Sequence, residues 1–283
     1  MTPSRLALDL SGGTLRVLEG MPGGPMRCGE SAAPAGALEG GRVLDAAALG
    51  QALRQLLARS EITTTRALIA ASDVIASFRV LTFPKGTPDA EIDNAVKAQL
   101  DMGSDRMAAR HIEVPGGEDE RTIFAAVWDR NQVLAIASAA RQAGLEPAAV
   151  DLKSLCVARA IPVASCILLD MTADPCEAVL IDDHVPRAAH SFRLESGGDL
   201  ALAVANGLKP VLAFQRRSGA RGFGPESPIL VRSDQVLPSL LTGRLEHLIG
   251  HPVDPLPRPP RVDPDVRFVP YLACIGLVMR RRV

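Results

Sequence analysis

The stretch from Leu6 to Glu19 constrains the fold most, because its apolar residues alternate on both sides of a glycine turn. Alternation with period two is typical of half-buried strands, so the stretch predicts a hairpin. Asp9 closes the first strand, and Gly12 and Gly13 form the turn. We expect the glycines to take positive φ and to leave backbone N–H groups uncovered, an arrangement that can hold a phosphate.

A similar piece occurs in the second half of the chain, at Ile167–Asp174, where a strand again ends in an acid, Asp170. Each piece alone is equally typical of an ordinary hairpin with a hydrophilic tip. Their pairing, with one in each half of the chain, favours two duplicated lobes that face a cleft.

Composition excludes several classes of function. The chain has 283 residues, of which 47% are hydrophobic, and a net charge of −1, so it can build two domains or one large one. The chain has no excess of basic residues and few aromatic residues, which argues against nucleic-acid binding. No apolar run reaches the roughly 18 residues needed to span a bilayer. Arg5 and Asp9 interrupt any secretory leader, so we expect a cytoplasmic protein.

Metal and catalytic motifs are weak or missing. The five cysteines form no CxxC pair and are typical of small buried residues in a reducing compartment. His247 and His251 could share a helical face, but Gly250 and Pro252 end that helix, and no third ligand is evident beyond Asp254. We therefore expect no metal site and name no catalytic residue.

Residue periodicity predicts further elements along the chain. Helices are expected at 45–60 with Asp45 as N-cap, Thr87–Leu100 with Thr87 as N-cap, Asn131–Ala143 before Gly144, Leu152–Ala160, Asp199–Gln215, Gln235–Ile249 and Val269–Arg282. Strands are expected at Arg66–Ala71, Ile75–Phe83, His111–Val114, Thr122–Trp128, Ala148–Asp151, Glu177–Asp182, Pro186–Arg193 and Pro228–Arg232. Residues 76–145 thus form a β-α-β-β-α insert, and the Pro-rich stretch 252–266 is expected to be extended.

Several motifs occur in an order that is similar to one family. They are Asp9–Arg16, Arg79–Pro84 with the helix Asp89–Val96, Ala143–Asp151, Cys156–Ala160, Asp170, Arg193, Gly197–Asp199 and Ile275–Arg280. This order resembles the PilM-like branch of the actin-like fold, whose members are cytoplasmic proteins of type IV pilus assembly related to the division protein FtsA.

The resemblance implies an α/β, actin-like (ribonuclease H-like, ASKHA) fold with two lobes, a small inserted α/β subdomain and a shortened second lobe. The first lobe would comprise residues 1–75 and 146–165, the insert residues 76–145, and the second lobe residues 166–283.

In this fold ATP lies between the lobes, and both hairpins contact its phosphates. If the site is retained, the resemblance assigns nucleotide binding to Asp9, Ser11, Gly12, Gly13, Thr14, Asp170 and Thr172. The chain departs from the pattern at three places: Ser11 replaces a glycine, Met171 replaces the glycine after Asp170 and would crowd a phosphate, and Val231–Asp234 replaces a Gly-Gly pair near the adenosine. These departures favour a degenerate site with no cofactor over a working site for ATP with Mg²⁺.

The function that the resemblance implies is therefore a non-enzymatic scaffold of a type IV pilus or related secretion machine, recruited to the inner face of the cytoplasmic membrane. Its partner would be a cytoplasmic peptide of an inner-membrane protein, laid in a groove of the first lobe and its insert. The candidate elements are Ile75–Phe83 and Glu91–Leu100, although core packing accounts for Ile92 and Val96. The insert would also be a surface for self-association.

Other functions stay open at this point. They are an ATP-binding assembly ATPase, the cytoplasmic module of a type II secretion protein, and a sugar-kinase-like enzyme. The terminal helix also has two interpretations, an amphipathic foot on the membrane or a buried helix. Its apolar residues lie nearly all round, from Val269 to Met279, which favours burial.

Overall fold

The computed structural model describes residues 4–100, 105–172, 175–194, 199–218, 222–233 and 238–280. The expected motif residues Gly197, Gly198 and Asp234 lie outside these ranges. The chain divides into two compact units: the first contains residues 1–160, 261–266 and 271–283, and the second contains residues 161–260 and 267–270.

The first unit is built on a five-stranded sheet in the order β10-β6-β1-β2-β3. Its strands are β1 (Arg5–Asp9), β2 (Thr14–Gly20), β3 (Met26–Ala32), β6 (Arg66–Ala71) and β10 (Glu146–Leu152). β1, β2 and β3 are antiparallel neighbours, while β6 and β10 run parallel to β1. The predicted first hairpin is thus the centre of this sheet. A small ribbon, β4 (Leu38–Glu39) and β5 (Arg42–Val43), leads into the first helix.

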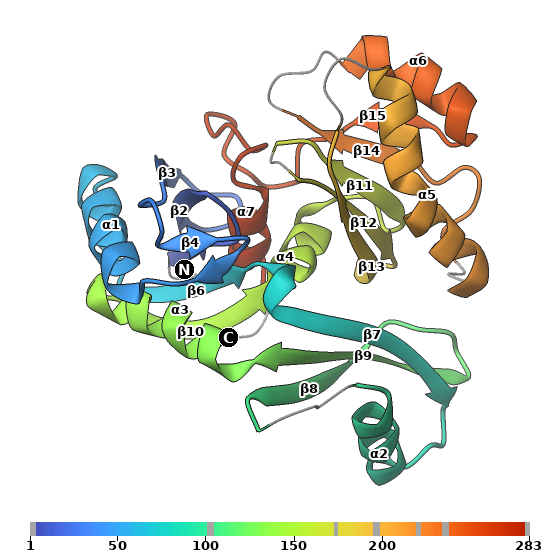
Figure 1. Cartoon of the computed structure of the whole chain (residues 1–283), viewed down its shortest axis with the longest axis horizontal. Coiled ribbons are helices and arrows are strands. Elements are labelled where there is room, and N and C mark those ends of the chain that lie inside the picture. Colours follow the sequence, from blue (N-terminus) through green and yellow to red (C-terminus); the bar gives the residue numbers. More distant parts are fainter. Residues whose placement is uncertain are drawn as a thin grey trace. The chain divides into compact units, whose positions relative to one another are not determined.

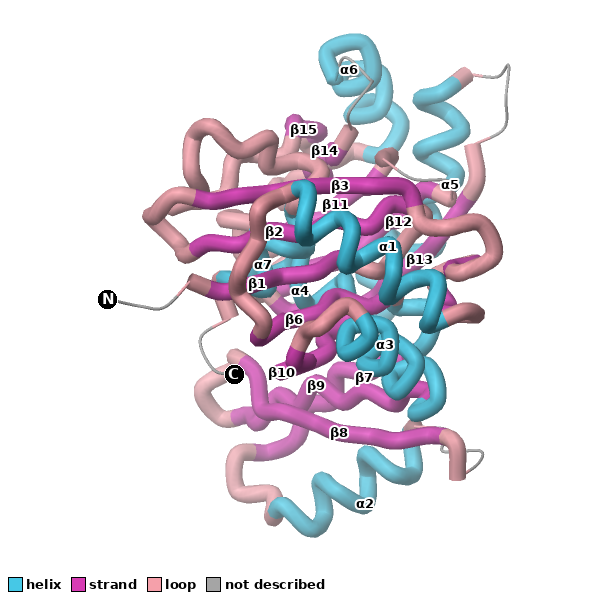
Figure 2. Tube along the Cα trace, turned by 90° about the vertical axis from the view of Figure 1, so that its left-hand side faces the viewer, coloured by secondary structure: helices cyan, strands magenta, loops and turns pink. Residues whose placement is uncertain are grey.

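Helices cover both faces of this sheet (Figures 1 and 2). They are α1 (Ala46–Arg59), α3 (Arg130–Gln142), α4 (Lys153–Ala160) and α7 (Leu272–Val278). Leu6 and Leu8 of β1 join the core that α1 and α3 close, whereas α7 contacts β1 and packs on α4. Asp45 caps α1 as predicted, because its side chain accepts from the amides of Ala47 and Ala48.

The inserted segment forms its own sheet, as predicted. Its order is β7-β9-β8, from β7 (Ala76–Pro84), β8 (Met107–Val114) and β9 (Glu120–Asp129), and α2 (Asp89–Gln99) covers one face. Two details differ from the expectation. α3 packs against α1 in the core of the main sheet, so the separate layer ends at β9. The N-cap of α2 is Pro88 and not Thr87, and no side chain caps this helix.

The second unit repeats the strand order of the first. Its sheet has the order β13-β12-β11-β14-β15, from β11 (Cys166–Asp170), β12 (Cys176–Asp182), β13 (Val185–Phe192), β14 (Ile229–Arg232) and β15 (Val253–Pro255). Helices α5 (Leu200–Ser218) and α6 (Pro238–Ile249) pack on this sheet. Again three antiparallel strands are followed by two that run parallel to the first. This repetition confirms the duplication that the paired hairpins predicted.

The terminal helix is shorter than expected and belongs to the first unit. α7 covers Leu272–Val278, and all seven of its residues are buried, so the core interpretation of this helix is confirmed. The expected second lobe, 166–283, therefore differs from the second unit, because residues 261–266 and 271–283 belong to the first unit. Among the described residues, no helix combines the length and the apolar character that a membrane crossing requires.

Candidate functional site

The first hairpin presents a buried carboxylate whose turn is closed by a hydroxyl. Asp9 is 2% exposed, and its Oδ1 accepts from the amide of Ser11 at 3.0 Å and from the hydroxyl of Ser11 at 2.6 Å. The amide of Leu10 donates to the carbonyl of Ala70, which extends the pairing of β1 with β6. Both amides that follow Asp9 are therefore engaged within the unit.

The glycines of this turn differ from expectation. Gly12 and Gly13 are not among the described glycines with positive φ, so the predicted conformation was wrong. The bonds from Ser11 to Asp9 shape the turn instead. A Cβ at either glycine would meet nothing within 4 Å, so their backbone is open. Thr14 begins β2 and pairs with Ala32.

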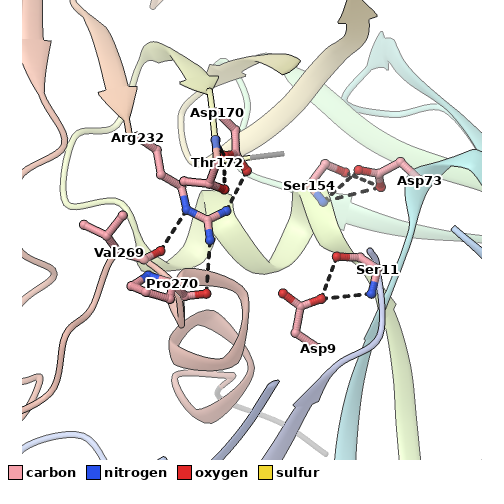
Figure 3. Close-up of polar contacts among 9 residues, drawn as sticks. All are labelled: Asp9, Ser11, Asp73, Ser154, Asp170, Thr172, Arg232, Val269 and Pro270. Carbon is pink, nitrogen blue, oxygen red and sulfur yellow. Dashed lines mark hydrogen bonds and ion pairs between the residues drawn. The ribbon is translucent and has the colours of Figure 1, made fainter. Parts of the chain in front are cut away.

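The second hairpin repeats this geometry within the second unit (Figure 3). Asp170 is 3% exposed, and its Oδ1 accepts from the amide of Thr172 at 3.0 Å and from its hydroxyl at 2.6 Å. The amide of Met171 donates to the carbonyl of Arg232 at 2.9 Å. Residue by residue, Asp170 corresponds to Asp9, Met171 to Leu10 and Thr172 to Ser11.

This correspondence corrects the argument from Met171. The side chain of Met171 packs against the core of the second unit, as Leu10 packs into the core of the first. Met171 therefore does not stand where a glycine would approach a phosphate, and the expected crowding by its thioether was wrong. The side chain in that position is Thr172, whose hydroxyl faces Asp170.

Arg232, which ends β14, distinguishes the second hairpin from the first. Its Nη1 donates to Oδ2 of Asp170 at 2.6 Å, while Nε donates to the carbonyl of Val269 at 2.8 Å and Nη2 to that of Pro270 at 3.1 Å. Arg232 is 2% exposed and is the largest fully buried side chain among the described residues. The sequence stretch Val231–Asp234 was singled out, but nothing in it indicated this ion pair.

Sequence reasoning also missed Asp73, which caps α4 within the first unit. Its Oδ2 accepts from the amide of Ser154 at 3.0 Å, and its Oδ1 accepts from the Ser154 hydroxyl at 2.9 Å (Figure 3). Ser154 is fully buried. Burial raises the pKa of the nearby Cys156 thiol well above its ordinary value. The charge of Arg159 lowers this pKa, and carboxylates that include Asp9 and Asp73 raise it further.

The two candidate partner-binding elements, α2 and β7, differ in which of their groups remain accessible to a partner. The apolar side chains of α2, Ile92, Val96 and the following Leu100, are buried in the core of the insert. β7 lies at an edge of its sheet and pairs only with β9 among the described residues. Of the two predicted elements, β7 therefore keeps an open backbone edge.

Metal ligation finds little support in the described part of the chain, which contains no group of three or more His, Cys, Asp or Glu side chains arranged to hold an ion. Gly250 has a φ of 72°, which ends α6 between His247 and His251 as predicted. Nδ1 of His251 lies 3.2 Å from the carbonyl oxygen of Ser227, and the imidazole ring is tilted against the ring of Phe223.

Comparison with known proteins identifies the fold. No protein-family model and no curated protein sequence matches the chain. A chain of a PilM-PilN type IV pilus biogenesis complex is similar over 97% of both chains, with a TM-score of 0.67 and 20% identity. The cytoplasmic domain of EpsL, an inner membrane component of the type II secretion system of Vibrio cholerae, matches 99% of this chain and 96% of its own length, with a TM-score of 0.55 and 10% identity.

A Bacteroides thetaiotaomicron protein of unknown function with an actin-like ATPase fold gives a TM-score of 0.50 at 11% identity, over 95% of this chain and 94% of its own. With two units of the same strand order and these neighbours over nearly its whole length, the chain has an actin-like fold.

Proposed function

We propose that this chain is a cytoplasmic scaffold of a type IV pilus or related secretion machine, which recruits the cytoplasmic tail of an inner-membrane partner. One observation carries the proposal: the whole chain is similar both to a chain of a PilM-PilN complex and to the cytoplasmic domain of an inner membrane secretion component. The partner would be a PilN-like protein, and recruitment would place the scaffold at the inner face of the membrane.

β7 is the element that we propose for the partner peptide. A peptide in extended conformation can pair with an open sheet edge and gain main-chain hydrogen bonds, while side chains beside the edge set specificity. Val80 of β7 and Ile112 of β8 both flank Phe124 of the central strand, so they lie on the same face of this sheet at opposite edges. This arrangement supplies a matched pair of variants.

The test uses the full chain and a synthetic peptide of the cytoplasmic tail of the PilN-like protein from the same organism. Val80→Glu should weaken binding at least tenfold by fluorescence anisotropy, because it adds a charge beside the β7 edge. Ile112→Glu, whose parent side chain is 45% exposed, should change the affinity less than twofold. The opposite ranking would assign the peptide to the β8 edge. Equal, unchanged affinities would contradict a site on this sheet.

The proposal includes a degenerate nucleotide site. In each turn the two amides after the aspartate are engaged within the unit, so they are not available to a phosphate. Asp170, the acid of the second hairpin, already faces the guanidinium of Arg232. The residues present therefore fit a magnesium nucleotide poorly, and we propose that no cofactor is needed. Self-association through the insert stays a prediction.

Calorimetry with Mg-ATP tests this part separately. We expect weak or undetectable binding by the wild-type protein. A dissociation constant at or below about 10 μM, about −7 kcal/mol, would contradict the degenerate site and favour the alternative of an ATP-binding assembly factor. Partner binding without nucleotide would still support the scaffold.

A further inference from the structure

The buried ion pair between Asp170 and Arg232 has no counterpart at the equivalent position of the first unit, where Ala70 stands opposite Asp9. The two side chains are 3% and 2% exposed, and their charged atoms lie 2.6 Å apart. Removing one partner of such a pair leaves an uncompensated buried charge, which is strongly destabilising. Asp170 therefore depends on a positive charge that the fold itself supplies.

The duplicated sheet provides an internal comparison for this arginine. In parallel register, Asp9 of β1 lies opposite Ala70 of β6, and Asp170 of β11 lies opposite Arg232 of β14. The carbonyl of Ala70 accepts a hydrogen bond from the amide of Leu10, and the carbonyl of Arg232 accepts the equivalent hydrogen bond from the amide of Met171. In the first unit the same strand and turn form with alanine at this position. The guanidinium of Arg232 is therefore present in addition to the strand and turn that the two units share.

The guanidinium also reaches beyond the hairpin. Its other donors bond the carbonyls of Val269 and Pro270, in the segment that leads directly into α7. Arginine suits this role because its planar group offers five donors and stays charged. One side chain therefore joins the acid of the second hairpin to the chain segment before the terminal helix.

We propose that Arg232 is a resident cation, a fixed positive group that takes the place of a divalent metal at Asp170 and holds residues 269–270 to the hairpin without any ligand. This inference rests on the proposed degenerate nucleotide site, and it names Arg232 as the residue that makes the site degenerate. A divalent cation brought to Asp170 would meet the like charge of the guanidinium at close range, in surroundings with little water to screen it.

Thermal unfolding of the full chain with and without 10 mM Mn²⁺ or Mg²⁺ tests the proposal. The wild-type melting temperature should not respond to either cation. Arg232→Ala should lower it by on the order of 10 °C, and the cations should restore at least a third of that loss. Asp170→Asn combined with Arg232→Ala should not respond. Arg187→Ala, which breaks the ion pair of Arg187 with the buried Asp182 in the same sheet, should not respond either.

Two results would overturn the proposal. One is a folded Arg232→Ala variant that no divalent cation stabilises. The other is a wild-type protein that binds Mn²⁺, followed by water-proton relaxation, and loses this binding in Asp170→Asn. The Mn²⁺ measurement on the wild type tests the proposal even if Arg232→Ala does not fold. A wild type that binds no Mn²⁺ supports a position at Asp170 that the guanidinium of Arg232 already occupies. Failure of the partner peptide to bind would contradict the scaffold function and leave the cation result unchanged.

Discussion

Gly276 is the described glycine at which an added Cβ would come closest to another atom. It lies in α7, and a Cβ built on it would overlap the carbonyl oxygen of Cys156 in α4, a backbone atom that cannot turn aside. We expect Gly276→Ala to lower the free energy of unfolding by about 3 kcal/mol, the upper end for overpacked cores. Urea denaturation followed by circular dichroism measures the loss.

Gly243 in α6 is the matched control, because a Cβ there meets nothing within 4 Å. Gly243→Ala should be neutral or stabilise by up to roughly 1 kcal/mol through helix propensity. Equal effects of the two alanines would show that α4 and α7 do not pack as closely as described.

The buried thiol of Cys166 makes stability depend on alkaline pH. Burial raises its pKa from 9.0 to about 12. The unfolded chain therefore loses this proton above pH 9 while the folded chain keeps it, so stability is full below pH 9 and falls between pH 9 and about 12. The slope is about 1.4 kcal/mol per pH unit for one thiol. Urea unfolding at pH 8, 9, 10 and 11 should show a shallower decline for Cys166→Ser, and an unchanged decline would contradict this assignment.

Local patterns predicted the acids of the site but not their partners. Asp9 and Asp170 were found because each ends an apolar strand before a polar turn. Arg232 lies 62 residues from Asp170, and Ser154 lies 81 residues from Asp73, so only tertiary structure brings these pairs together. The φ angles of the first turn were mispredicted because side-chain bonds, and not glycine freedom, decide them.

The terminal helix α7 should be indispensable to the first unit. All its residues are buried, and the guanidinium of Arg5 in β1 donates to the carbonyls of Val278, the last residue of α7, and of Arg280, two residues further on. Deletion of residues 270–283 should therefore give insoluble or unfolded protein, whereas a chain ending at Arg280 should stay soluble. A deleted protein that keeps its melting temperature but loses liposome binding would restore the interpretation of a membrane foot.

Elements with strong periodicity were predicted closely, and irregular ones were missed. The predicted helix at 45–60 and strand at Arg66–Ala71 match α1 and β6. Residues 20–42 are rich in Gly, Pro and Ala, a composition that predicts a loop and only an irregular strand. β3 is nevertheless a regular strand, because it pairs with β2 along its whole length. β15 was missed because it has three residues in a Pro-rich stretch and depends on β14.

At the level of the whole molecule, the paired hairpins predicted duplication, and both units have the same strand order. The strand order itself was not predicted, because hydrophobic patterns do not specify which strands are neighbours. The return of the chain to the first unit, at residues 261–266 and again from Tyr271, was not predicted. Assigning the second lobe as one continuous stretch, 166–283, cannot anticipate a terminal helix that packs against a segment more than a hundred residues earlier.

Calorimetry of the full chain with the cytoplasmic peptide of the PilN-like protein, in the absence and presence of 1 mM Mg-ATP, tests the central claim most directly. The account predicts one peptide bound per chain, with a dissociation constant on the order of micromolar, about −8 kcal/mol. Mg-ATP should leave this constant unchanged, because Arg232 already fills the position at Asp170. No binding, or binding that requires Mg-ATP, would contradict the account.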